Sequence, residues 1–284
     1  MVDIVQLNRE TNAFVRTASF NHPYPATKVM FAPPKVEGDL IATSGDYLRI
    51  WKVSEDGTEV NLRALYNNNK ASPYCAPLTS FDWNLIDPSI IGTCSIDTTC
   101  TIWNVETQQY KTQLIAHDRE VYDIVFAPHT TDIFASTGAD GSVRLFDLRS
   151  LEHSTILYEN PNGSPLLRLA WDRYDHNYIA AVVAEENTVV ILDVRSASVP
   201  VATLFGHSHP VNAVSWFPGQ ARYLATGGDD RQALVWDLTN LPQPIKNPYL
   251  SFETDEEVNA LQWSTLHPEW VSMVHGKYLQ VVRV

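Results

Sequence analysis

Short apolar runs, separated by clusters of Gly, Pro, Asn and Asp, follow one another along the whole chain. This punctuation is typical of β-strands joined by tight turns. The stretch 206–237, GHSHPVNAVSWFPGQARYLATGGDDRQALVWD, shows the pattern most fully, with strand-like runs at 211–216, 223–226 and 232–238. Since no segment keeps a 3.6-residue period over three turns, the pattern predicts an all-β protein.

A residue near the end of a strand-like run recurs at spacings of 46, 52, 43, 46, 44 and 46 residues. This period is close to the roughly 40–45 residues of WD repeats, each of which folds as one blade of a β-propeller. We therefore expect a WD-repeat β-propeller, all-β, as a single domain over residues 1–284. The repeat anchors are Val5, Trp51, Trp103, Phe146, Leu192, Trp236 and Val282.

The other strands of each repeat fall in the same register as the anchors. Two runs precede an anchor and one follows it, as four-stranded blades require. The preceding pairs are 27–31 and 39–43, 78–83 and 90–94, 121–126 and 132–136, 166–171 and 178–183, and 258–263 and 270–274; the following runs are 14–20, 60–66, 110–115, 154–158, 201–205 and 249–252.

Two arrangements of the blades agree with this register. The run 3–7 already has the form of a third strand, which favours a seven-bladed family design with its first blade incomplete in this chain. Alternatively, the run 14–20 closes a six-bladed ring. A propeller must pair its strand edges. In the seven-bladed design about 40 further N-terminal residues would supply the first two strands of the first blade and the closing strand.

Two repeats share a set of polar residues at matching spacing. His207, Thr226, Asp230 and Trp236 form the first set. The second set is His117, Ser136, Asp140 and Phe146, and in both sets His and Asp are 23 residues apart and Asp precedes the anchor by six. We expect each set to be a buried hydrogen-bonded brace inside its blade, in which every polar group is satisfied. The third repeat keeps Thr93, Asp97 and Trp103 but has no matching His.

The same residue types also compose the catalytic triad of a hydrolase. The set occurs twice, however, and the sequence has no G-x-S-x-G nucleophile elbow. We therefore expect a protein that is not an enzyme and has no catalytic residues, with a propeller hydrolase as the alternative from another functional class.

Composition and charge limit the ligands. The chain has 284 residues with a formal net charge of −13, which argues against direct nucleic-acid binding and against anionic membranes. Three cysteines are too few for a disulfide framework and indicate a reducing compartment. His and Cys are not spaced as metal ligands, and no Gly-rich phosphate loop occurs, so neither a metal nor a cofactor is expected.

Longer segments are more specific than the repeat alone. HPYPATK (22–28), CAPLTSFDWN (75–84), KTQLIAHDREVYDI (111–124) and GADGSVRLFDLRSLEHSTI (138–156) resemble one WD-repeat family. It comprises the plant transparent testa glabra and anthocyanin-regulating proteins and an animal DDB- and cullin-associated factor. The resemblance runs from about residue 15 to Val284, and it departs from the family in lacking the family's N-terminal segment.

This resemblance implies a non-catalytic scaffold that assembles regulatory proteins in cytoplasm and nucleus. The implied partners are MYB and basic helix-loop-helix transcription factors, or protein kinases of DYRK or HIPK type. Asp147 with Arg149, and Asp193 with Arg195, are also similar to the WDxR box of cullin-RING ubiquitin-ligase substrate receptors, whose Arg contacts the ligase adaptor. The alternative interpretation is a surface Arg that pairs with the Asp of its own blade.

Overall fold

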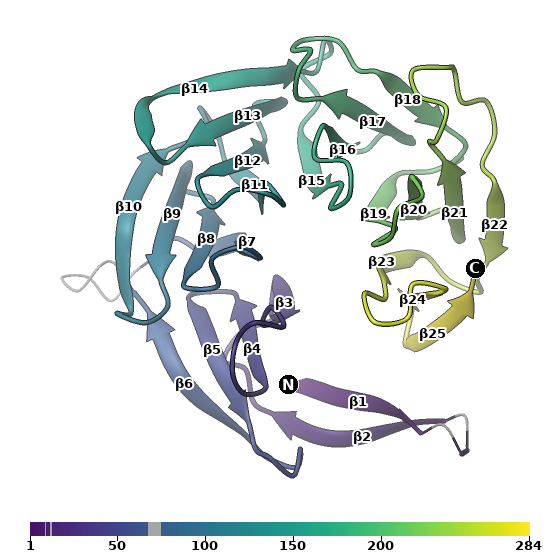
Figure 1. Ribbon diagram of the computed structural model, residues 1–284. Helices are drawn as coiled ribbons and strands as arrows, with labels where there is room; N and C mark the ends of the chain where they lie inside the picture. The colour runs from purple at the N-terminus through teal and green to yellow at the C-terminus, as the bar shows by residue number, and fades with distance from the viewer. Residues whose placement is uncertain (9, 12, 68–74) are drawn as a thin grey trace. The chain divides into compact units, whose positions relative to one another are not determined.

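The computed structural model describes residues 1–8, 10–11, 13–67 and 75–284. Within them every helix or strand is a β-strand, which confirms the all-β class. The chain divides into two compact units, Met1–Ile115 and Ala116–Val284. Each unit is built from sheets of strands that are consecutive in sequence and antiparallel (Figure 1).

The first unit contains one hairpin and two four-stranded sheets. The hairpin pairs β1 (Val2–Asn8) with β2 (Ala13–Phe20). The first sheet has the order β3 (Lys28–Phe31), β4 (Leu40–Ser44), β5 (Leu48–Val53) and β6 (Val60–Tyr66). The second sheet has the order β7 (Leu78–Trp83), β8 (Ile90–Ser95), β9 (Thr99–Asn104) and β10 (Gln109–Ile115).

The second unit contains three four-stranded sheets and one three-stranded sheet. Its first sheet has the order β11 (Val121–Phe126), β12 (Ile133–Gly138), β13 (Ser142–Asp147) and β14 (Ser150–Glu159), and its second has the order β15 (Leu166–Trp171), β16 (Tyr178–Val183), β17 (Thr188–Asp193) and β18 (Ala202–Phe205). Its third sheet has the order β19 (Val211–Trp216), β20 (Tyr223–Gly228), β21 (Gln232–Asp237) and β22 (Leu250–Glu253). The three-stranded sheet has the order β23 (Val258–Trp263), β24 (Trp270–His275) and β25 (Tyr278–Arg283).

The core of each unit lies between successive sheets. One cluster joins Ile50 and Leu48 of β5 to Phe81 and Trp83 of β7 in the first unit. In the second unit, similar clusters join the β11 sheet to the β15 sheet, the β15 sheet to the β19 sheet, and the β19 sheet to the β23 sheet. The central strands β8 and β16 are therefore buried at every position, which is why neither alternates between apolar and charged residues.

The predicted strands agree closely with the structure, and the blade count matches one of the two expected arrangements. Five sheets of four strands and one of three make six blades among the described residues, which is the number in the six-bladed alternative. The seven-bladed design is not contradicted, since β1 and β2 are the two strands that it assigns to the first blade. The clearest difference in bounds is β14, which begins at Ser150 and not at Ser154 because Ser150 already pairs with Asp147 across a tight turn.

Candidate functional site

The first of the two predicted polar sets is centred on His207, in the loop before β19. Its Nδ1 donates to the carboxylate of Asp230, with both oxygens 3.0 Å away, so Nε2 is left to accept the Thr226 hydroxyl at 2.8 Å. The Thr226 oxygen in turn accepts the indole N–H of Trp236 at 2.9 Å. The backbone N–H of Ser208 also donates to Asp230. The structure thus joins all four residues of this set in one chain of hydrogen bonds.

The set around His117 has the same core with a different surrounding. Nδ1 lies 3.0 Å from both oxygens of Asp140, and Nε2 lies 2.8 Å from the Ser136 hydroxyl. The fourth member cannot donate a hydrogen bond, because Phe146 has no polar atom; its ring stacks on Phe134 at 4.9 Å. Two residues that the spacing did not single out complete the group: Ser142 and Arg144 both donate to Asp140.

Burial lowers the solvation of Asp140 and by itself raises its pKa. The hydrogen bond and charge of His117, with the bonds from Ser142, outweigh this effect and hold the pKa of Asp140 well below its usual range. The carboxylate therefore stays ionised in the folded protein at neutral pH and serves as a permanent acceptor for the loop and the turn that meet here.

A third network was missed by the sequence reasoning. His22 Nε2 lies 3.0 Å from the Thr43 hydroxyl, which accepts the indole N–H of Trp51 at 2.8 Å. Here His and Thr are 21 residues apart, against 19 in the other two sets, and Trp follows Thr by eight residues instead of ten. Asp46, in the turn between β4 and β5, pairs with Arg49, and Nδ1 of His22 meets the carbonyl of Tyr24.

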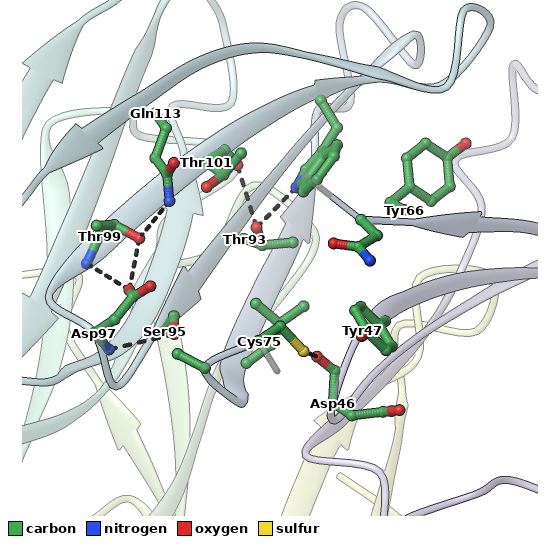
Figure 2. Close-up of a pocket in the computed structure, with 14 residues that line it drawn as sticks. Asp46, Tyr47, Tyr66, Cys75, Thr93, Ser95, Asp97, Thr99, Thr101 and Gln113 are labelled. Carbon is green, nitrogen blue, oxygen red and sulfur yellow. Dashed lines mark hydrogen bonds between the residues drawn. The ribbon is translucent and has the colours of Figure 1, made fainter. Parts of the chain in front are cut away.

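The β7–β10 blade has Thr93, Asp97 and Trp103 at the spacing of the other sets, but the sequence has no histidine at the matching position. Thr93 accepts the Trp103 indole N–H at 2.9 Å, and Asp97 accepts the N–H and hydroxyl of Thr99. At the spacing of the missing His, the sequence has Tyr74, which lies outside the described residues. A polar cavity of about 280 Å³ borders Thr93, Asp97 and Trp103 (Figure 2).

The two Asp–Arg pairs occupy equivalent turns of consecutive blades. Arg149, in the β13–β14 turn, donates from Nε (2.9 Å) and Nη2 (2.6 Å) to Asp147. Arg195 makes the same two bonds to Asp193 after β17, at 2.9 and 2.6 Å. Both arginine side chains remain more than 60% exposed. This is the pairing with the Asp of its own blade, and it fixes the direction of each guanidinium.

Both pairs perturb their carboxylates in the same direction. The side-chain hydrogen bond from Arg149 lowers the pKa of Asp147 to about 2, and the bond from Arg195 lowers the pKa of Asp193. Because each Arg uses Nε and Nη2, its Nη1 keeps two N–H donors for another acceptor. The strand register places these turns at the end of the sheet opposite to the His–Asp networks: Asp147 opposes Ile133, whereas Val121 opposes Gly138.

The polar networks are poor candidates for catalysis because their hydroxyls are enclosed. Ser136 and Thr226 have no exposed surface, and the Thr226 oxygen is already engaged by the Trp236 indole. Among the described residues, no group of three or more His, Cys, Asp or Glu side chains could hold a metal ion. No helix in the described part of the chain is long and apolar enough to span a membrane.

Comparison with known proteins agrees with the blade structure. The WD domain, G-beta repeat model matches residues 108–147 and 198–237, the segments that contain the Asp140 and Asp230 turns. This match confirms that the protein is a WD-repeat β-propeller.

Relatives extend the likeness to the whole chain. A DDB1- and CUL4-associated factor 7 homolog of Dictyostelium discoideum is 52% identical over 100% of this chain and 87% of its own length. An uncharacterized WD repeat-containing protein of Schizosaccharomyces pombe is 36% identical over 92% of this chain and 75% of its length. A WD repeat-containing protein of Saccharomyces cerevisiae is 41% identical over 92% and 66%. The chain belongs to the WD-repeat family of the DDB1- and CUL4-associated factor 7 homologues.

Proposed function

We propose that this chain is a non-catalytic adaptor that holds regulatory proteins together. The observation that carries this proposal is the 52% identity along the whole chain to a protein named for its association with other proteins. The burial of the Ser136 and Thr226 hydroxyls supports it, since these groups brace blades and do not reach the surface.

The partners we propose are those implied by the family resemblance: MYB and basic helix-loop-helix transcription factors, or DYRK- and HIPK-type kinases, in cytoplasm and nucleus. The net charge of −13 favours partners with basic segments. Affinity purification of the full chain with mass spectrometry tests this. Recovery of such regulators in stoichiometric amounts is expected, whereas a chain that purifies alone from both compartments would overturn the proposal.

A second candidate function is that of substrate receptor for a cullin-RING ubiquitin ligase. The observation that favours it is the pair of exposed guanidinium groups of Arg149 and Arg195, held alike in adjacent blades. Two fixed, charge-assisted donors at one end of neighbouring sheets can be met together by acidic or carbonyl groups of one partner surface.

The double variant Arg149→Ala, Arg195→Ala tests this contact with purified DDB1 in a surface-binding assay. We expect at least a tenfold loss of affinity, because truncating charged contacts commonly has this effect. The matched control is Arg119→Ala, Arg231→Ala, which removes the same charge from exposed residues at the opposite end of the sheets of the same unit. Unchanged binding of the first variant, or equal loss in both, would refute the ligase contact while leaving the adaptor function standing.

A further inference from the structure

In three blades of this protein a buried histidine ring contacts a hydroxyl group, and a fourth blade is built as if to receive such a ring. In two of the three, the ring bridges a buried hydroxyl and a carboxylate: Thr226 and Asp230 for His207, and Ser136 and Asp140 for His117. The β7–β10 blade has Thr93 and Asp97 at the same spacing from its Trp as Thr226 and Asp230 have from theirs. Among the described residues that line the cavity beside Thr93 and Asp97 there is no histidine.

Thr93 and Asp97 make the same contacts as their counterparts in the blades that contain a histidine. Thr93 Oγ1 accepts the Trp103 indole N–H at 2.9 Å, the same distance as between Trp236 and Thr226. Asp97 Oδ1 accepts the backbone N–H and the hydroxyl of Thr99, and Asp140 Oδ1 accepts the same two groups from Ser142. The local geometry therefore presents a hydroxyl and a carboxylate in the pose that binds imidazole elsewhere in the chain.

Exposure distinguishes this blade from the filled ones. The side chains of Asp230 and Asp140 are 2% and 10% exposed beneath their histidines, whereas Asp97 lies open to solvent. The Thr93 hydroxyl donates to the carbonyl of Thr101 over a long 3.3 Å, so it can turn to a better acceptor at small cost. Both groups line the cavity of about 280 Å³, which is large enough for a five-membered ring (Figure 2).

The remaining walls favour a planar group that is not an anion. Trp103 and Tyr66 supply aromatic surface, and Tyr47 and Cys75 close the side toward the preceding blade. The hydrogen bond to Cys75 raises the pKa of Tyr47, and burial raises the pKa of Tyr66 to about 12, so both phenols stay protonated at neutral pH. Asp46 and Asp97 both line the cavity, which disfavours an anion.

We propose that this cavity is a binding site for an imidazole ring. The ring N–H donates to Asp97, and the other ring nitrogen accepts the Thr93 hydroxyl, which leaves the carbonyl of Thr101. The ring comes from a histidine side chain of a bound protein or from a free imidazole compound. The first source rests on the proposed adaptor function, and the binding of the ring itself does not.

In the test, 4-methylimidazole is titrated into the full chain at pH 8, and binding is measured by the NMR chemical shift of the Trp103 indole N–H. We expect saturable binding in the millimolar range and at least tenfold weaker binding of 1-methylimidazole, which lacks the N–H. Asp97→Asn should weaken 4-methylimidazole at least tenfold, because the amide keeps the oxygen facing Thr99 and turns a donor toward the ring.

The matched control is Asp56→Asn, which removes the same charge from a similarly built turn: Asp56 accepts the N–H and hydroxyl of Thr58. It should leave probe binding unchanged. A peptide that contains histidine and the same peptide with Ala in place of that histidine then distinguish the two sources of the ring. Selective binding of the histidine peptide assigns the site to a protein partner, and binding of 4-methylimidazole but of neither peptide assigns it to small imidazole compounds. The proposal is overturned if none of the probes binds, or if Asp97→Asn binds 4-methylimidazole as tightly as the wild-type chain does. Either result counts whether or not partners are recovered in the affinity purification.

Discussion

The imidazole of His207 and the carboxylate of Asp230 meet at 3.0 Å, and each side chain is only 2% exposed. A buried carboxylate is costly unless it is paired, and here its partner is itself fixed by the Thr226 hydroxyl. The pair therefore ties the loop before β19 to the turn between β20 and β21.

Replacing His207 with Ala should destabilise the fold by about 2–4 kcal/mol, because Asp230 and Thr226 lose their partner inside the blade. Urea unfolding followed by Trp fluorescence measures the change. His209→Ala is the control, since His209 is exposed two residues away, and it should change the stability by less than about 0.5 kcal/mol. An unchanged free energy of unfolding for His207→Ala would contradict the bracing role of the set.

The network around Asp140 should make stability depend on pH in acid. The pKa of Asp140 is lower in the folded protein than in the unfolded chain, so the native state binds fewer protons. Its stabilising contribution is therefore complete above about pH 4, the unfolded value, and is lost as the pH falls further. We expect the stability difference between wild type and Asp140→Asn to be largest above about pH 4 and to shrink below it. A difference that grows in acid would contradict this assignment.

Arg222 should stabilise the contact between the β15–β18 and β19–β22 sheets. It pairs with Asp175 and lies 4.9 Å from the ring centroid of Tyr178. Arg222→Ala should cost about 1–2 kcal/mol, and Arg222→Lys less, because Lys keeps the charge but not the planar stacking. The comparison is Arg173→Ala, an exposed residue of the same β15–β16 turn as Asp175, measured by the same unfolding assay. Equal losses of stability in Arg222→Ala and Arg173→Ala would show that Arg222 does not stabilise the contact between these sheets.

Gly138 should be intolerant of a side chain for a steric reason. A Cβ there would lie 2.4 Å from the carbonyl oxygen of Glu120, which is held by the N–H of Ala139. Gly138→Ala is expected to cost about 2 kcal/mol or more, since backbone must move. Gly163→Ala should cost only about 1 kcal/mol: its φ of +69° is unfavourable for Ala, but no atom lies within 4 Å. Thermal unfolding compares the two, and a smaller effect at Gly138 would contradict the close approach.

Regular spacing made much of the fold predictable from the sequence. β7, β11 and β15 have the predicted bounds because each begins and ends at a change between apolar runs and turn residues. The two histidine sets were also found by spacing, since a repeated turn length keeps His, Ser or Thr, and Asp in fixed positions. The set at His22 was missed because the connection between β3 and β4 is two residues longer than that between β19 and β20, and because Thr43 and Trp51 each lie one residue nearer their turn than Thr226 and Trp236 do.

Other features could not be read from the residues alone. Asp123 accepts the backbone N–H of Leu169, and Ser215 accepts that of Trp263, each in the first strand of the next sheet. These bonds link residues 46 and 48 positions apart, and nothing in either local sequence distinguishes them from ordinary strand residues. They depend on the packing of one sheet against the next.

By itself, the sequence determined the strand order and two of the histidine sets that brace the blades, because both follow from the repeat period of about 45 residues. Only the tertiary structure decided which polar groups remain available. In the structure Arg149 pairs with Asp147 and Arg195 pairs with Asp193. Asp97 is open to solvent, whereas Asp230 is enclosed. The reason is physical: exposure and hydrogen-bond geometry depend on neighbours that are distant in the chain, and a repeat pattern contains no information about them.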